Sequence, residues 1–217
     1  MKDQYVIDID GLTVYDGEYL LAEIDRKLGA LRTEKYNVLK NAVNATAKKA
    51  KADLIAKAQA EYTAKKGSLS KATTQKNATI AKPEATLTVK GGMLEIRSFK
   101  TTVPKSGAKA KILQSGNLKT IQSQKGSRAK AFLTTFQSGH KAIVQRQDGE
   151  RYKVGDAIQR RKKMWGKNAD MTRIKELMSV SFPIMVGGSS VLGKLAPGIV
   201  DDLKRNVQIE IRKVLER

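Results

Sequence analysis

Residues 131–146, with the sequence AFLTTFQSGHKAIVQR, decide how the middle of this chain folds. Two runs rich in aromatic and β-branched residues flank Gln137-Ser138-Gly139, and a three-residue loop that ends in glycine suits a type I turn with the glycine in the left-handed region. The stretch therefore predicts a β-hairpin. Its expected register sets Phe136 opposite His140, Thr134 opposite Ala142, Leu133 opposite Ile143 and Phe132 opposite Val144.

This register gives the hairpin two unequal faces. One face carries Phe132, Phe136 and Val144, whereas the other is half apolar, with Leu133 and Ile143 among polar side chains. Such a hairpin usually sits inside a small sheet that a helix covers on one side. We expect the pair on the half-apolar face to contact a neighbouring subunit.

A long helix is predicted from Thr33 to about residue 66. Apolar residues step by three or four over about seven turns, and much of the stripe is alanine, so a neighbour can approach closely. A helix laid across a sheet is the preferred interpretation, and a contact between identical helices is the alternative. The stripe consists of Tyr36, Leu39, Val43, Ala47, Ala50, Leu54, Ala58 and Tyr62.

A second long helix is predicted at the C-terminus, where Pro197 occupies a first-turn position. Its expected buried stripe is Ile199, Leu203, Val207, Ile211 and Val214. Ile209 falls off that stripe, and we expect it to face a neighbouring chain together with Leu133 and Ile143.

The remaining elements are shorter. Residues 1–16 are interpreted as a short strand or an extended N-terminal arm, and a helix is expected over residues 17–28 with a break at Gly29. Period-2 alternation over residues 78–80, 85–89 and 93–99 predicts an antiparallel meander, with Gly91-Gly92 linking its last two strands. Residues 177–182 form another strand candidate that ends before Pro183.

These elements predict an α+β fold. An antiparallel β-sheet of four to six strands is covered by the long Ala-rich helix and by the C-terminal helix, because neither helix has a stripe broad enough to be buried alone. Residues 1–16 are assigned to an arm, and residues 17–217 to a single domain that contains a mobile basic loop at residues 104–130.

Net charge is the strongest compositional signal. The chain has 42 basic and 21 acidic residues, a net charge of +21, and residues 67–135 alone hold 13 basic and 2 acidic side chains. The positive electrostatic field of such a charge favours a polyanion or an acidic protein surface as the binding partner.

Two segments are candidates for contact with DNA or an acidic partner. The loop 104–130 has no acidic residue and could also form a weak hairpin around Gly116-Asn117, and a second basic run precedes Trp165. The candidate residues are Lys105, Lys109, Lys111, Lys119, Lys125, Arg128 and Lys130 in the loop, and Arg160, Arg161, Lys162 and Lys163 in the second run.

Nothing in the chain indicates an enzyme, a cofactor or a resident metal. There is no cysteine, and His140 is the only histidine, so a zinc centre built from several His or Cys ligands is excluded. Residues 188–194 match G-x-x-x-x-G-K, but Leu195 replaces the Ser or Thr that would hold magnesium, so no nucleotide site is expected. Asp201 and Asp202 diverge on a helix and do not form a carboxylate pair. No membrane span and no signal peptide are expected.

The order of these elements resembles a known family. An Asp10-Gly11-Leu12 segment precedes the Ala-rich helix with LKNAVNATAKKA (39–50), a basic meander leads to AFL…G…VQR (131–146), and VSFPIM (180–185) precedes a helix closing on RKVLER (212–217). This pattern is similar to the minor tail protein Z family of tailed bacteriophages, also called tail-completion or neck proteins. It covers most of the chain from about residue 10.

The resemblance implies a structural virion protein at the head-proximal end of the tail, assembled in the host cytoplasm. Such a protein is expected to act late in tail assembly and to help place the genome end. It would form a homo-oligomeric ring, expected to be a hexamer, next to tail terminator, tail tube and head–tail connector proteins, in contact with phage DNA. A non-sequence-specific nucleic-acid-binding protein is the alternative that the charge suggests.

Overall fold

The computed structural model describes residues 7–9, 12–13, 17–65, 68–122, 130–151 and 172–216. These residues belong to two compact units. Unit 1 comprises Met1–Glu61, Lys66–Gly92 and Val180–Arg217, and unit 2 comprises Tyr62–Lys65 and Met93–Ser179. The predicted single domain over residues 17–217 is thus divided in two, each unit with its own buried residues.

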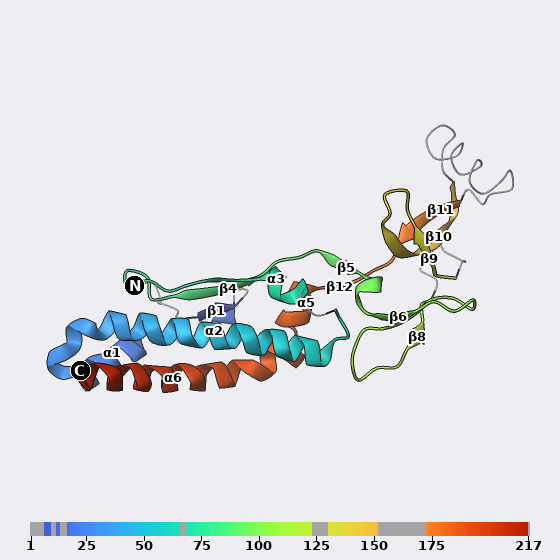
Figure 1. Ribbon diagram of the computed structural model, residues 1–217. Helices are drawn as coiled ribbons and strands as arrows, with labels where there is room; N and C mark the ends of the chain where they lie inside the picture. Colours follow the sequence, from blue (N-terminus) through green and yellow to red (C-terminus); the bar gives the residue numbers. More distant parts are fainter. Residues whose placement is uncertain are drawn as a thin grey trace. The chain divides into compact units, whose positions relative to one another are not determined.

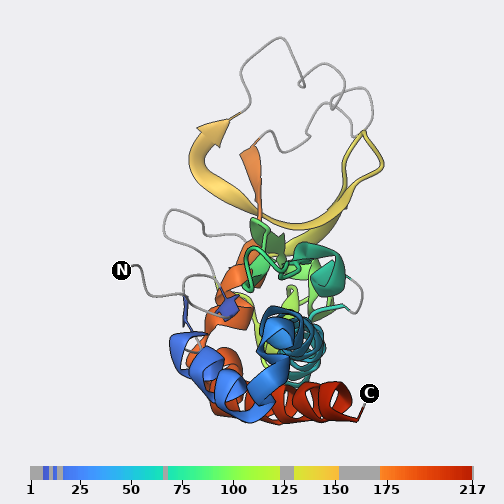
Figure 2. The ribbon, with the colours of Figure 1, turned by 90° about the vertical axis from the view of Figure 1, so that its left-hand side faces the viewer.

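The long helices of the described chain belong to unit 1. They are α1 (Gly17–Leu28), α2 (Lys35–Glu61) and α6 (Lys194–Leu215), with a short 3-10 segment at Gly29–Glu34 between the first two. Figures 1 and 2 show α6 running along one side of α2. The predicted break at Gly29 is confirmed, because this residue adopts φ +52, a conformation that favours glycine at a helix end.

The predicted stripe of α2 is largely confirmed. Leu39, Val43, Ala47, Ala50, Leu54 and Ala58 are buried, and Val38, Ala42 and Thr46 widen the buried face. Tyr36 was placed on the stripe wrongly, since it is 42% exposed at the first turn. A wider face than one stripe indicates that α2 contacts neighbours on more than one side.

The main neighbour of α2 is another helix rather than a sheet. α2 packs along α6 and contacts α1, and it also contacts β3 and β4 of the sheet. Polar groups also join the two long helices: Asn206 Nδ2 donates to Thr46 Oγ1 at 2.8 Å, and Lys49 Nζ lies 2.5 Å from Asp202 Oδ2. The alanines permit this close approach, as the sequence indicated.

The C-terminal helix begins earlier than predicted. α5 (Phe182–Gly187) and a π-helical segment (Ser189–Gly193) lead directly into α6, so Pro197 lies inside the first turn rather than opening the helix. Ile199, Leu203, Val207 and Ile211 are buried as predicted. Val214 is half-buried at the C-terminal end of the stripe.

By length and composition alone, the stretch Phe182–Leu215 is apolar enough to cross a membrane, which the sequence analysis did not anticipate. Several of its large apolar side chains are instead buried in the core of unit 1. Phe182, Met185, Val191 and Leu192 are each at most 6% exposed. α5 and the π-helical segment contact α2, and α5 also contacts β4.

Unit 1 contains a four-stranded sheet with the order β2-β1-β4-β3. Its strands are β1 (Ile7–Ile9), β2 (Leu12–Thr13), β3 (Thr73–Lys76) and β4 (Ala85–Val89), and α3 (Ser68–Ala72) precedes β3. β1 pairs with β4 in parallel, and the other pairs are antiparallel. Residues 7–9 and 12–13 of the predicted arm therefore belong to this sheet.

The predicted meander is confirmed as strand at residues 85–89 and 93–95, but its first strand and its last pairing are wrong. Its first strand is β3, at residues 73–76 rather than 78–80, and Gly91-Gly92 does not close a hairpin. Instead the chain leaves unit 1 there, and β5 (Met93–Glu95) pairs with β12 (Met178–Ser181). Alternation shows that a segment is extended but not which strand it will meet.

Unit 2 is built on the predicted hairpin. β9 (Phe132–Thr135) pairs with β10 (Lys141–Arg151), and the register sets Thr134 opposite Ala142, Leu133 opposite Ile143 and Phe132 opposite Val144, as predicted. The Phe136 N–H donates to the His140 carbonyl at 2.7 Å, and Gly139 has φ +81. β11 (Thr172–Glu176) adds to the other edge of β10.

A small core lies against one face of this hairpin. Ala108, Ala131, Ile143 and Leu177 are almost completely buried together, with Ile96 and Ile121 packed around them. Ile96 belongs to a 3-10 turn, Ile96–Ser98, that follows β5. Unit 2 thus has an apolar cluster of its own.

Part of the predicted basic loop forms β-strands. β6 (Lys100–Thr102), β7 (Lys109–Lys111) and β8 (Lys119–Thr120) form an antiparallel three-stranded sheet. β7 and β8 form a hairpin, as in the alternative given above, but its tight turn is at Leu113–Gly116, where the Gly116 N–H donates to the Leu113 carbonyl, rather than at Gly116-Asn117. The α+β class, with antiparallel sheets and a C-terminal helix, is confirmed.

Candidate functional site

The sheet β6-β7-β8 gathers lysines on one face. Lys100 pairs with Lys111, Thr102 pairs with Lys109, and Lys109 also pairs with Thr120. Directly paired residues of antiparallel strands, and residues two apart on one strand, share a face. One face consequently presents Lys100, Lys109, Lys111, Thr102 and Thr120, and we call it the lysine face.

No acidic side chain of the same segment neutralises the lysine face. The sequence has no Asp or Glu between Glu95 and Asp148. Among the residues that the structure describes, none of the three lysine ammonium groups of this face forms an ion pair. Some lysines of unit 1 do form ion pairs, since Lys35 and Lys213 lie 3.0 and 2.6 Å from carboxylate oxygens. The lysine face instead gathers three ammonium groups that no carboxylate of the described residues neutralises.

The other predicted lysines lie around this sheet. Lys105 is exposed in the turn that links β6 to β7, where the Gly107 N–H donates to the Pro104 carbonyl. Lys130 is exposed, and its side chain lies close to Gly107. Lys119 pairs with Ala110 and therefore points to the opposite face. Lys125, Arg128, Arg160, Arg161, Lys162 and Lys163 lie outside the described residues.

The three residues predicted for a subunit interface differ in exposure and belong to both units. Leu133 is 45% exposed on β9 in unit 2, and Ile209 is 43% exposed on α6 in unit 1. Ile143 is only 1% exposed and belongs to the core of unit 2, so its prediction as an interface residue is wrong. The half-apolar face of the hairpin is covered within the chain by Ala108 and Leu177 at this point.

Two sequence features that were judged inactive show no catalytic arrangement. The G-x-x-x-x-G-K segment is helical from Ser189, with Val191 and Leu192 buried, so it forms no open phosphate-binding loop. Asp201 is exposed, whereas Asp202 is buried and accepts from Lys49 and Arg205. The two carboxylates therefore lie in different environments and do not act as a pair.

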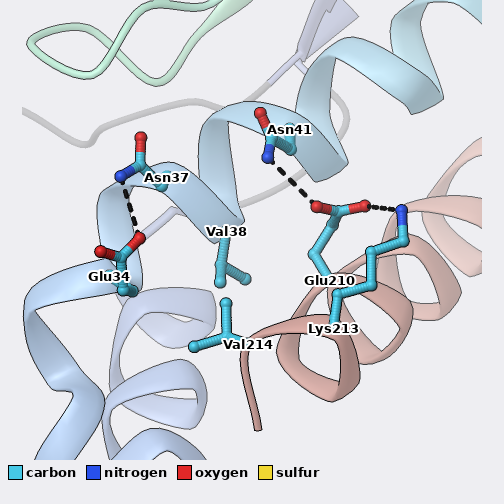
Figure 3. A pocket seen from close by; sticks show the side chains of 7 residues that line it. All are labelled: Glu34, Asn37, Val38, Asn41, Glu210, Lys213 and Val214. Atoms are coloured by element: carbon cyan, nitrogen blue, oxygen red, sulfur yellow. Dashed lines mark hydrogen bonds and ion pairs between the residues drawn. The ribbon is translucent and has the colours of Figure 1, made fainter. Parts of the chain in front are cut away.

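A polar cleft of about 210 Å³ lies between the start of α2 and the end of α6 (Figure 3). Its polar groups already bond to one another. Asn37 donates to Glu34 at 3.0 Å, while Glu210 accepts from Asn41 at 3.1 Å and from Lys213 at 2.6 Å. The bond between Asn41 and Glu210 links α2 to α6 across the cleft. The described side chains that line it therefore present no cluster of unsatisfied polar groups to a ligand.

His140 stands at the turn end of the hairpin, as predicted. Its ring stacks on Phe136, with the ring centroids 5.7 Å apart and an angle of 18° between the planes. Glu95 and Glu176, whose side chains reach His140 from other strands, carry no signal in the sequence that links them to this histidine.

Comparison with models of known protein families, with curated proteins and with solved structures finds no match to this chain. The family resemblance stated above stays a prediction from the residues quoted for it.

Proposed function

We propose that this protein is a non-enzymatic structural subunit of a tailed-phage virion, of the tail-completion or neck type, and that its lysine face contacts the DNA backbone. The proposed DNA contact rests on the row of lysines on β6 and β7 that form no ion pair within the described residues. The proposed virion role is supported by the sequence pattern from the Ala-rich helix to the VSFPIM segment.

The lysine face suits a phosphate backbone better than base edges. Its strands are short, and it carries lysine and threonine but no arginine, asparagine or aromatic side chain for base recognition. Ammonium and hydroxyl groups serve phosphate contacts that carry no sequence information. Binding through this face would be sequence-independent and strongly dependent on salt.

In the proposed assembly, copies of the chain form a ring, expected to be hexameric, next to terminator, tail tube and connector proteins. The exposed apolar side chains Leu133 and Ile209 are candidates for contacts between subunits. The ring would present lysine faces toward DNA at the end of the genome.

The proposal is tested by the composition of the virion and by the mass in solution. Mass spectrometry of purified virions should find the protein at a few copies per particle, and light scattering should find a discrete ring-sized species, alone or with its neck partners. Absence from virions would refute the structural assignment.

A free nucleic-acid-binding protein is the second candidate, which the same lysine face favours. It predicts a monomer that binds duplex DNA tightly with a steep salt dependence and that is absent from particles.

If the lysine face instead prefers an acidic protein surface, neck proteins should bind to it at salt concentrations at which short duplex DNA does not.

A further inference from the structure

The only histidine of the chain lies between two carboxylates. His140 Nε2 is 3.2 Å from Glu176 Oε1 and 3.5 Å from Glu95 Oε1, and the three atoms lie within 4.8 Å of one another. The side chains are 30–39% exposed, so the cluster is half-buried and open to solvent. We call these residues the Glu–His–Glu cluster.

The fold of unit 2 brings the cluster together from three separate elements. Glu95 is the last residue of β5, Glu176 is the last residue of β11, and His140 ends the turn before β10. Glu176 pairs with Val144, and Ala142 is the residue between His140 and Val144 on the same face. A methyl group at position 142 leaves room for the two longer side chains to meet.

Hydrogen bonding alone does not satisfy this arrangement. A single nitrogen, Nε2, faces both carboxylates, and an imidazole carries at most one proton there. The two carboxylates then share one N–H, although like charges this close repel each other. The nearby Arg97 guanidinium donates to the Lys141 carbonyl at 2.8 Å instead. A cation bound by all three side chains would neutralise both carboxylates.

The two separations that involve His140 Nε2 fit a small tetrahedral ion, and the two carboxylate oxygens lie within 4.8 Å of each other. Zinc lies about 2.0–2.1 Å from nitrogen and oxygen ligands in proteins, which places adjacent ligands of a tetrahedron about 3.3–3.4 Å apart. The two distances from Nε2, 3.2 and 3.5 Å, bracket that separation. The stack on Phe136 holds the imidazole plane, so little ordering of the histidine is required.

We propose that Glu95, His140 and Glu176 form a zinc-class divalent metal site that clips together β5, β11 and the turn of the β9–β10 hairpin. Three protein ligands leave a fourth position for water. A nitrogen ligand favours zinc-like ions over magnesium and calcium, which prefer oxygen ligands throughout. This inference does not depend on the phage assignment.

A single histidine and no cysteine exclude only a zinc centre built from several His or Cys ligands. Carboxylates are also zinc ligands. Glu95 and Glu176 lie far from His140 in sequence and match no ligand spacing, so only the folded unit brings them together.

Calorimetric titration of the untagged full-length chain with zinc chloride tests the proposal. One zinc ion per chain should bind, and magnesium or calcium chloride should give no saturable heat. His140→Ala, Glu95→Gln and Glu176→Gln should each weaken zinc binding by more than about tenfold. Glu150→Gln is the matched control, because Glu150 is a carboxylate of the same unit that pairs with Arg173, and it should bind zinc like the unchanged chain.

A direct readout comes from the imidazole itself. Because His140 is the only histidine, nitrogen-15 NMR gives one pair of ring signals, and zinc should shift the Nε2 signal far more than the Nδ1 signal. Circular dichroism of each variant establishes that it is folded. Absence of saturable zinc binding by the unchanged chain, or zinc binding that survives in folded His140→Ala, would overturn the proposal and leave an ion-paired histidine.

Discussion

Lys100 on β6 and Lys111 on β7 lie directly opposite each other across an antiparallel strand pair. Like charges in this position repel each other, and they destabilise a sheet by a few tenths of a kcal/mol up to about 1 kcal/mol. Lys109 extends the same face, and the sequence offers no acidic residue from 96 to 147. A bound polyanion would attract all three ammonium groups and so offset their mutual repulsion.

Replacing the three lysines of this face therefore gives the first prediction. The triple variant Lys100→Gln, Lys109→Gln and Lys111→Gln should bind short duplex DNA more weakly, because fewer counterions are released. The slope of log affinity against log salt should become shallower by about 2 to 3 units. Fluorescence anisotropy over a series of salt concentrations measures both quantities.

A control with the same charge change is available in unit 1. Lys71, Lys76 and Lys90 are exposed there, and their triple change to Gln should leave the salt slope nearly unaltered. Equal losses in the two triple variants would mean that total charge, and not the lysine face, governs DNA binding.

The alanines of α2 give the second prediction. Ala47 is fully buried on the helix that packs along α6, so Ala47→Leu should overpack this region and lower the free energy of unfolding by about 1–3 kcal/mol. Urea denaturation followed by far-UV circular dichroism reports unit 1, since its long helices provide most of that signal. Ala52→Leu, at an exposed position of the same helix, should change stability by less than about 0.5 kcal/mol.

Asp202 gives the third prediction. Its carboxylate is 11% exposed and accepts from Lys49 on α2 and from Arg205. Asp202→Ala should destabilise unit 1 by about 1.5–3 kcal/mol, as expected for hydrogen bonds to a charged group. The neighbouring carboxylate Asp201 is exposed, and Asp201→Ala should be nearly neutral by the same urea measurement. Equal effects of the two changes would contradict the role of the ion pairs.

The hairpin turn gives the fourth prediction. Gly139 has φ +81, and a Cβ added there would meet no atom within 4 Å, so a substitution incurs backbone strain without a clash. Gly139→Val should destabilise unit 2 by about 1–2 kcal/mol, whereas Gly139→Asn should cost less because asparagine tolerates the left-handed region. Hydrogen exchange of the β9 and β10 amides measures the difference. Indistinguishable exchange in the two variants would argue against this turn geometry.

Local patterns in the sequence determined several features of this protein. The three-residue loop ending in Gly139 determined the register of the β9–β10 hairpin, in which Phe132 pairs with Val144, because loop length and turn type set the register of a hairpin. The buried stripes of α2 and α6 and the break at Gly29 likewise follow from periodicity and from glycine's conformational freedom. Each of these features depends on residues close together in the chain.

Tertiary structure alone decided which segments meet. Alternation predicted a strand near residue 93, but pairing with β12 rather than β4 depends on contacts between distant residues, and so does the division into two units. Ile143 was predicted at a subunit interface because its face is half polar, and distant residues such as Leu177 bury it instead. The Glu–His–Glu cluster arose in the same way, because the fold joins side chains from three elements that no local spacing connects.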